Sequence, residues 1–282
     1  MKELRGMPVA GLMLEDIKER VKKLQQKNIF PKLAIVRIGE REDDLSYERG
    51  VYKRFENAGV LVETVKLSME VSQNELEKVI ESLNRNEKIH GVLLFRPLPK
   101  HLDEKRLKSL LQEEKDVDCL TYGNDAHLFA GDQKGYPPCT PQAVMELLDY
   151  YKIDLTGKKV TVIGRSMVVG KPVAMLLLSK NATVTICHTK TKNLQEECRK
   201  ADIIIAGAGV PKMITSEFVQ EGQIIIDVGI HVVDDKLCGD VDYETVSSLV
   251  EAITPVPGGV GSVTTTVLLK HTILSAEKLL DD

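Results

Sequence analysis

Lys159-Val-Thr-Val-Ile-Gly-Arg-Ser-Met-Val-Val-Gly-Lys-Pro172 is the stretch that decides how this chain folds. Its β-branched run at residues 160–163 predicts a strand, and the apolar segment at 173–179, rich in helix formers, predicts a helix. Between them, Gly164 allows the backbone to approach a ligand closely. Pro172 suits the first turn of a helix, whose free N–H groups favour phosphate. The stretch therefore predicts a strand, a tight turn and a helix that can hold a phosphate group.

The spacing in this turn differs from the usual Gly-x-Gly-x-x-Gly fingerprint, because Arg165 and Ser166 follow the first glycine directly. Taken alone, it is also consistent with a strand-to-helix turn that binds nothing. Further short apolar strands are predicted along the chain, separated by segments of helical length: residues 183–187, 202–206, 223–228 and 252–255. This alternation is expected of a doubly wound parallel sheet, so we predict a Rossmann-like nucleotide-binding lobe.

The end of the second predicted strand bears on the choice of nucleotide. In an NAD site an Asp or Glu near this point usually binds the ribose 2′-hydroxyl, whereas a 2′-phosphate needs positive charge and hydroxyl donors. Cys187-His-Thr-Lys-Thr-Lys192 contains no acid, which favours NADP over NAD. The residues expected to surround the 2′-phosphate are Arg165, His188, Thr189 and Lys190. A solvated basic loop is an alternative reading of Lys190 and Lys192.

Charge and composition narrow the function classes. The net charge is −4, from 38 basic and 42 acidic residues without a long run of one sign, so neither nucleic acid nor an anionic membrane surface is expected as a partner. The apolar run at residues 7–14 is cut off by Glu15 and Asp16, which is typical of neither a secretion signal nor a membrane span. We therefore expect a cytoplasmic protein.

The cysteines and histidines give no metal signal. The five cysteines are scattered without a Cys-x-x-Cys pair, and the six histidines do not fall at metal-ligand spacing. We expect reduced, structural cysteines and no metal.

The first 120 residues alternate in the same way and predict an α/β unit of their own. Helices are expected at residues 11–26, 45–58 and 73–85, and strands at 33–38, 61–67 and 91–95. Residues 116–140 hold turn formers and few periodic apolar positions, so we place the crossing between lobes there. A linking helix is expected from Pro141 to Tyr151 with Thr140 as its N-cap. A last helix, 265–280, would return to the first lobe and leave a cleft between the two.

The predicted fold class is thus α/β, with two lobes. Residues 1–140 together with a C-terminal helix at 265–281 would form a catalytic lobe, and residues 141–264 would form the Rossmann-like lobe. The loop Pro255-Val-Pro-Gly-Gly-Val-Gly261 follows the last strand, at the carboxyl edge where doubly wound sheets bind ligands. Its glycines expose backbone N–H groups to a ligand, although a tight loop without a ligand would have the same composition.

Six motifs of this chain stand in the order seen in methylenetetrahydrofolate dehydrogenase/cyclohydrolase, a family that essentially the whole chain resembles. They are Lys115-Asp-Val-Asp118, Pro138-Cys-Thr-Pro141, Gly164-Arg-Ser-x-x-Val-Gly-x-Pro172, Asp227-Val-Gly-Ile230, Gly239-Asp-Val241 and Pro255–Gly261. The resemblance implies a two-lobed homodimer with folate in the cleft and NADP on the C-terminal lobe. The family oxidises 5,10-methylenetetrahydrofolate to the methenyl form and usually hydrolyses that to 10-formyltetrahydrofolate.

The resemblance also implies roles for single residues. Tyr47 and Asp118 would be the catalytic-site residues against the folate, with Asp118 as pterin anchor, and Phe95 and Pro257 would lie near the same substrate. The residues implied to bind the cofactor are Gly164, Arg165, Ser166, His188, Thr189, Ile230, Gly261 and Thr264.

Two departures from the family pattern concern the hydrolytic step. The family has Tyr-x-x-x-Lys on the second helix, which puts phenol and ammonium on one face, but here Val51 follows Tyr47. Lys53 lies six positions on, roughly 240° round a helix, and so points elsewhere. The family sequence Gln-Leu-Pro-Leu after the third strand reads Phe95-Arg-Pro-Leu98 here, so the glutamine that would partner the lysine is also lost.

The two half-reactions do not need the same groups. Hydride transfer depends mainly on positioning, because the folate N5 lone pair can stabilise the developing cation. Hydrolysis of the methenyl form needs a base or donor for the attacking water, such as a lysine with a lowered pKa. We therefore predict an NADP-dependent dehydrogenase with weak or absent cyclohydrolase activity. The alternative is that Arg96 or Lys53 takes the place of the lysine, although a guanidinium is a poor base.

Other readings remain open at this point. A fully bifunctional enzyme would also make 10-formyltetrahydrofolate. A dehydrogenase acting on a shikimate-like acid would share the cofactor lobe but would need a Lys and Asp pair in the first lobe, which we do not find. A non-catalytic folate- or nucleotide-binding protein is disfavoured by the intact Asp118 and the intact glycine-rich motifs.

Overall fold

The computed structural model describes residues 1–132 and 134–280 and divides them into two compact units. The C-terminal unit consists of Met1–Gly11 and Thr140–Thr264, and the N-terminal unit consists of Leu12–Cys139 and the chain from Thr265 on. Two helices, α1 (Gly6–Gln26) and α10 (Gly261–Glu277), begin in the C-terminal unit and continue in the N-terminal one. Both begin before the predicted starts at 11 and 265.

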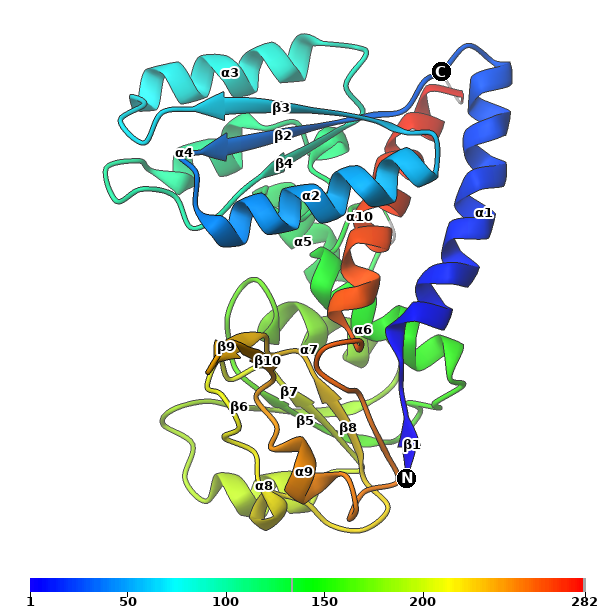
Figure 1. The fold of residues 1–282 in the computed structure, drawn as a ribbon, viewed down its shortest axis with the longest axis vertical. Helices are drawn as coiled ribbons and strands as arrows, with labels where there is room; N and C mark the ends of the chain where they lie inside the picture. The colour runs from blue at the N-terminus through cyan, green and yellow to red at the C-terminus, as the bar shows by residue number, and fades with distance from the viewer. Residues whose placement is uncertain (133, 281–282) are drawn as a thin grey trace. The chain divides into compact units, whose positions relative to one another are not determined.

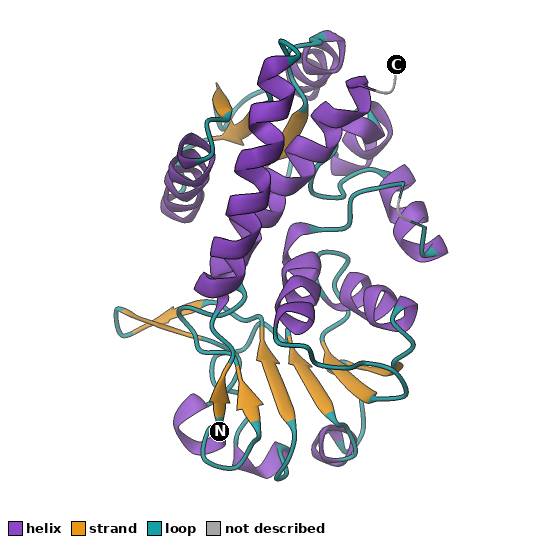
Figure 2. Ribbon diagram, turned by 90° about the vertical axis from the view of Figure 1, so that its right-hand side faces the viewer, coloured by secondary structure: helices purple, strands orange, loops and turns teal. Residues whose placement is uncertain are grey.

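The C-terminal unit is built on a parallel sheet in the order β1-β11-β8-β7-β5-β6. Figure 2 shows its strands side by side with their arrowheads pointing the same way. The strands are β1 (Lys2–Glu3), β5 (Lys159–Ile163), β6 (Thr183–Cys187), β7 (Ile203–Ala206), β8 (Ile224–Asp227) and β11 (Ala252–Ile253). The predicted doubly wound parallel sheet is confirmed.

The strand order places a topological switch point in this sheet. β5 pairs with β6 on one side and with β7 on the other, so the chain reverses its direction of winding at β5 (Figure 1). Loops that follow β5 and β7 therefore diverge at the carboxyl edge, where such sheets bind ligands. The remaining elements of the unit are α6 (Cys139–Tyr150), α7 (Gly170–Ser179), α8 (Leu194–Arg199), η2 (Ser216–Phe218), β9 (His231–Val233), β10 (Lys236–Cys238) and α9 (Tyr243–Val246).

The first residues of the chain belong to this sheet, whereas the prediction placed all of 1–140 in the other lobe. Lys2 pairs with Ala252, and the Leu4 N–H donates to the Ile253 carbonyl at 2.8 Å. Leu4 itself is fully buried. A two-residue strand carries no readable periodicity, and its pairing partner lies at the far end of the sequence, so the local pattern could not reveal it.

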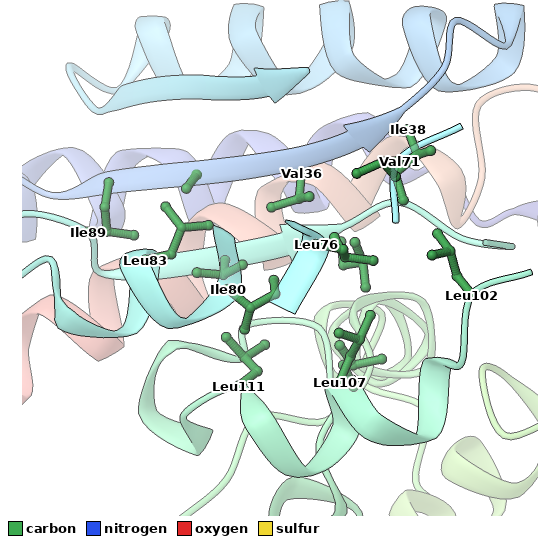
Figure 3. Packing of buried hydrophobic residues seen from close by; sticks show 14 residues of the cluster. Val36, Ile38, Val71, Leu76, Ile80, Leu83, Ile89, Leu102, Leu107 and Leu111 are labelled. Carbon is green, nitrogen blue, oxygen red and sulfur yellow. The ribbon is translucent and has the colours of Figure 1, made fainter. Parts of the chain in front are cut away.

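The N-terminal unit holds a parallel sheet in the order β3-β2-β4. Its strands are β2 (Lys32–Ile38), β3 (Leu61–Leu67) and β4 (Gly91–Leu94), and its helices include α2 (Glu42–Asn57), α3 (Gln73–Arg85) and α4 (Glu104–Leu110), with short 3-10 turns η1 (Glu113–Lys115) and η3 (Lys278–Leu280). Side chains alternate between the two faces of β2. Val36 and Ile38 pack with leucines of α3 and α4 in one apolar cluster (Figure 3). Arg37, on the opposite face, reaches α2, where its Nε donates to Glu48 at 2.7 Å.

One helix was missed in the stretch predicted as a crossing loop. α5 (Tyr122–Ala130) begins after Thr121, whose hydroxyl accepts from the Asn124 N–H, and ends at Gly131 with φ 72°. Its fully buried side chain is the polar Asn124, so apolar periodicity could not find it. The predicted cap Thr140 is also wrong, because α6 already begins at Cys139. Among the described residues, no helix is both long and apolar enough to cross a membrane.

Candidate active site

One face of α2 and Phe95 together form an aromatic wall at the candidate substrate site. Tyr47, Val51 and Phe55 recur every four residues and so lie on the same face. Val51 and Phe55 are 0% exposed, whereas Lys53 lies on the exposed side of the helix. The Tyr47 ring packs on Phe95, with centroids 5.8 Å apart and planes inclined by 50°. The positions that hold Lys and Gln in the family pattern are therefore both apolar and buried.

Asp118 lies next to this wall, in the segment that precedes α5, and contacts Cys139, the first residue of α6. Its Oδ1 accepts a hydrogen bond from the Cys139 N–H at 2.9 Å, and its Oδ2 is 3.7 Å from Nη2 of Arg96. Burial raises the pKa of the Asp118 carboxyl, while the Cys139 N–H and the Arg96 charge pull that pKa down. The side chain is nevertheless 28% exposed, so this carboxylate can be reached by a ligand.

Arg96 brings a cation to the pocket. It follows Phe95 at the end of β4, and its guanidinium lies between two carboxylates, with Nη1 3.7 Å from Glu104 and Nη2 3.7 Å from Asp118. In the described part of the chain, no other basic side chain forms an ion pair with Asp118. Of the two alternatives considered for the missing lysine, Arg96 is thus close to the pocket and Lys53 is not.

The Tyr47 phenol stays protonated in this setting. Burial raises its pKa well above the ordinary value, and the neighbouring Asp118 adds to the effect because a phenolate would be repelled by the carboxylate. The Cys139 thiol donates to the Val117 carbonyl, with Sγ 3.4 Å from the oxygen, and burial raises its pKa too. Neither group is poised to act as a base.

The motif that contains Asp118 also contains two residues whose roles are structural. Asp116 is fully enclosed and accepts hydrogen bonds from the Leu120 N–H, the Thr121 N–H and hydroxyl, and the Asn124 amide. Lys115 Nζ donates to the carbonyls of Leu83, Asn84 and Asn86 at the end of α3. Both fix the chain on which Asp118 stands. Sequence reasoning identified the motif without separating these two roles.

In the C-terminal unit, the turn after β5 lies at the switch point of the sheet. Gly164 has φ 117°, and a Cβ there would meet the carbonyl of Gly207, which follows β7. A Cβ on Gly170 would meet the carbonyl of Gly164. The turn is therefore closed so tightly that only glycine fits. The exposed Ser166 accepts at Oγ from the Val169 N–H at 3.0 Å, at the start of α7.

The loop after β6 is ordered by residues of its own. The His188 N–H donates to Thr191 Oγ1 at 2.8 Å, and His188 Nδ1 accepts from the Lys190 N–H at 3.1 Å. This bond places the ring proton of neutral His188 on Nε2. Thr189 and Lys190 remain exposed. Sequence reasoning missed the part played by Thr191, because a threonine in a polar loop gives no signal of this kind.

A cavity of about 160 Å³ lies at the carboxyl edge of β8 and β11. Ile230, Pro257 and Gly261 line it together, and Ile230 is 60% exposed. A Cβ on Gly261 would lie 3.0 Å from Cδ1 of Ile230, so the glycine keeps this space open. Thr264 is not among the lining residues. Its hydroxyl donates to the Val260 carbonyl, with 3.4 Å between the oxygens.

Two buried aspartates hold the wall of this cavity. Asp227 accepts from the N–H groups of Gly229, Asp240 and Val241 at 2.9–3.0 Å, and burial raises its pKa to about 6 against the pull of those bonds. Asp240 accepts from the Gly209 N–H and lies 2.7 Å from Nε2 of His231. The loop that carries Ile230 is thereby tied to the hairpin of β9 and β10. Sequence reasoning noted these motifs without predicting that they bind each other.

These features fit a dinucleotide. The glycine turn, the start of α7 and the cavity near Ile230 lie along one carboxyl edge of a doubly wound sheet. Within residues 1–132 and 134–280, no three His, Cys, Asp or Glu side chains lie close enough together to form a metal site.

The fold and the glycine turn define a nucleotide-binding α/β protein. Comparison with known families is more specific. The model of the tetrahydrofolate dehydrogenase/cyclohydrolase catalytic domain matches residues 4–118, and that of the NAD(P)-binding domain of the same family matches residues 138–280. The chain belongs to the tetrahydrofolate dehydrogenase/cyclohydrolase family.

Similar proteins cover the whole chain. The bifunctional protein FolD of Carboxydothermus hydrogenoformans is 52% identical over 98% of this chain and 97% of its own length. The crystal structure of the bifunctional enzyme from Campylobacter jejuni aligns with a TM-score of 0.97 at 39% identity, over 99% of both chains. The enzyme from Trypanosoma brucei, solved with NADP and an inhibitor, aligns with a TM-score of 0.93 at 34% identity, over 99% and 98%.

Proposed function

We propose that this protein catalyses the NADP-dependent oxidation of 5,10-methylenetetrahydrofolate to 5,10-methenyltetrahydrofolate and has little or no cyclohydrolase activity. One observation carries the proposal. Val51 and Phe95 are 0% and 8% exposed, on the wall formed with Tyr47, where the family pattern has the lysine and the glutamine. The pocket keeps its carboxylate, Asp118, and lacks the amine.

The remaining residues suffice for the first half-reaction. The Cys139 N–H and Arg96 stabilise the negative charge of the Asp118 carboxylate, which can accept from the N–H groups of a pterin ring. Tyr47 and Phe95 offer a rigid aromatic surface on which the substrate can lie. Bound NADP supplies the hydride acceptor. No side chain has to move a proton, so orientation accounts for most of the catalysis.

The second half-reaction needs a group that this pocket lacks. Water that adds to the methenyl carbon must lose a proton to a base held nearby. Tyr47 is protonated, Lys53 is on the exposed side of α2, and the Arg96 guanidinium does not deprotonate in proteins. Hydrolysis would then proceed at close to its uncatalysed rate.

On the cofactor side, we propose that the turn after β5 binds the phosphates and the loop after β6 binds the 2′-phosphate of NADP. Gly164 and Ser166 would serve the first role, while Arg165, His188, Thr189 and Lys190 would serve the second. Exposed cationic and hydroxyl groups without an acid among them support NADP over NAD. The trypanosomal relative was solved with NADP. Ile230 and Gly261 would lie along the nicotinamide half of NADP. Thr264 would act indirectly, by holding the carbonyl of Val260, which lines the same cavity.

A full bifunctional enzyme is the second candidate, favoured by the name of the relative that is 52% identical. One assay separates the possibilities: methenyl absorbance is followed with purified protein, methylenetetrahydrofolate and NADP. A signal that grows and persists supports the dehydrogenase alone. A signal that rises and then decays faster than the uncatalysed rate supports the bifunctional enzyme, and no signal supports a non-catalytic binder.

A further inference from the structure

The guanidinium of Arg96 lies beside Asp118, and its hydrogen-bond donors are not taken by protein acceptors within residues 1–132 and 134–280. Its two ion-pair contacts, to Glu104 and Asp118, are both 3.7 Å long, beyond hydrogen-bond distance. In the described part of the chain it donates no hydrogen bond. The side chain is 19% exposed, so it is mostly shielded from solvent but a ligand can still reach it. A charged donor that is mostly shielded from water and has no acceptor among the residues that the structure describes favours an acceptor on a ligand.

The neighbouring groups restrict where that acceptor can be. Oδ2 of Asp118 lies 3.7 Å from Nη2 of Arg96, and Phe95, the preceding residue, packs on Tyr47. A planar ligand that lies on this aromatic wall and gives its N–H groups to Asp118 would bring the next atom along its edge to Arg96. That atom must be an acceptor, because the guanidinium only donates.

We propose that Arg96 donates a hydrogen bond to the C4 carbonyl of the pterin ring and so makes the pocket selective for 4-oxo folates over 4-amino folates. The inference rests on the proposed function, since it requires Asp118 to bind the pterin. The edge of a 4-oxo pterin presents the 2-amino group, N3–H and the C4 oxygen in that order. Two donors thus face the carboxylate and one acceptor faces the guanidinium.

This role belongs to the residues of this chain. The family pattern has leucine at the position of Arg96, and a leucine cannot donate. The lysine and glutamine that would supply polar contacts in the family are replaced by the apolar Val51 and Phe95. Next to Asp118 the structure therefore offers Arg96 as a charged donor, beside the neutral phenol of Tyr47. Glu104, the first residue of α4, lies 3.7 Å from Nη1 of Arg96, while Nη2 lies on the side of Asp118.

A direct contact between Arg96 and the ligand can be distinguished from a simpler role, in which Arg96 only stabilises the charge of Asp118. A 4-amino pteridine places an amino group where the carbonyl would be, so donor would face donor at Arg96. If Arg96 contacts this atom, its removal must weaken tetrahydrofolate binding and spare the binding of the 4-amino analogue. If it acts only through Asp118, both ligands must weaken by the same factor.

The experiment measures dissociation constants of tetrahydrofolate and 4-amino-4-deoxytetrahydrofolate, under anaerobic conditions, for the full-length protein and three variants. Arg96→Leu removes the donor, and Arg96→Lys keeps a charge that can still donate. Arg106→Leu is the matched control, because Arg106 stands on α4 but is paired with Glu77 at 2.8 Å. Circular dichroism and the melting temperature of each variant show that it is folded.

We expect Arg96→Leu to lower the preference for the 4-oxo ligand by about tenfold or more, the size expected of a hydrogen bond to a charged donor. Arg96→Lys should keep part of the preference, and Arg106→Leu should keep all of it. Equal weakening of both ligands by Arg96→Leu, or an unchanged preference, overturns the role of Arg96 while leaving the proposed function intact. Failure of the unaltered protein to bind tetrahydrofolate overturns both.

Discussion

Val51 lies one helical turn after Tyr47 on the same face of α2, and its side chain is fully buried. A lysine at this position would extend toward the space beside the Tyr47 and Phe95 rings, where burial would lower the pKa of its amine and make it a better base. Val51→Lys combined with Phe95→Gln should therefore accelerate the decay of methenyltetrahydrofolate about tenfold over the uncatalysed rate, a fraction of what a well-placed base provides.

The control for this gain is Val51→Met with Phe95→Gln, which keeps a long side chain and lacks the amine. The decay of methenyltetrahydrofolate absorbance, followed at several protein concentrations, measures the rate of hydrolysis for both double variants. Burying the charge of the lysine destabilises the folded state, so the melting temperature of the lysine variant should fall below that of the methionine variant. Hydrolysis that is the same in both variants would show that the missing amine is not what limits the reaction.

Asp118→Ala tests the pterin anchor. The variant loses the acceptor that faces Arg96 and the Cys139 N–H, and we expect the Michaelis constant for methylenetetrahydrofolate to rise by about 10- to 100-fold, as for a hydrogen bond to a charged group. Because burial raises the Asp118 pKa, folate affinity of the unaltered protein should fall as the pH drops through this raised value. An affinity that is flat with pH and unchanged in the variant would remove Asp118 from the binding site.

Arg165→Ala tests the choice of nucleotide. The exposed guanidinium follows Gly164 at the switch point, and a 2′-phosphate is the part of NADP that NAD lacks. We expect the Michaelis constant for NADP to rise by roughly tenfold or more, with that for NAD nearly unchanged. Arg199→Ala, an exposed arginine at the end of α8, is the control. Equal effects on the two nucleotides would mean that Arg165 does not contact the 2′-phosphate.

Asp227→Asn tests the link between the cavity wall and the hairpin. The folded pKa of about 6 lies above the roughly 3.9 of an unfolded aspartate, so the folded state binds this proton more tightly. Asp227 therefore adds stability as the pH falls, by about 1 kcal/mol between pH 7 and pH 5. The asparagine variant should lack this increment.

Urea unfolding of both proteins at the two pH values measures the difference. The variant should also be less stable at pH 7 by about 1–3 kcal/mol, because its NH₂ group cannot accept from the backbone N–H groups that Asp227 binds. An identical pH dependence in the two proteins would assign the titration to another group.

How much of this architecture the sequence predicts depends on the range of the interaction. Strands such as β5 and β7 have β-branched runs with a local signature, and the doubly wound sheet followed from their alternation with helices. The helix α5 had no such signature, because the side chain that it buries is Asn124. Burial of a polar group depends on a partner elsewhere in the chain, here Asp116, and periodicity carries no information about it.

The same limit applies to the candidate site. The sequence pointed to Asp118 and to Arg96 as a candidate cation, yet the contact between them depends on how the end of β4 packs against the segment before α5. The hydrogen bonds from the Asp240 and Val241 N–H groups to Asp227 could likewise not be predicted, because the sequence of two separate motifs does not show that they contact each other. Motifs predict which residues matter, and packing decides their partners.

Lys115→Met tests whether a motif residue next to the site is structural. Lys115 Nζ donates to the Leu83, Asn84 and Asn86 carbonyls at 2.6–2.9 Å and closes the end of α3. Methionine keeps the length of the side chain and removes its donors. The carbonyls at the end of the helix, which have no helical N–H to bind, then lose their hydrogen-bond partner. The free energy of unfolding should fall by about 1–3 kcal/mol, measured by urea denaturation. The Michaelis constant for methylenetetrahydrofolate, measured well below the melting temperature, should stay within twofold of the unaltered protein. A large rise in that constant without a loss of stability would place Lys115 in the substrate pocket instead.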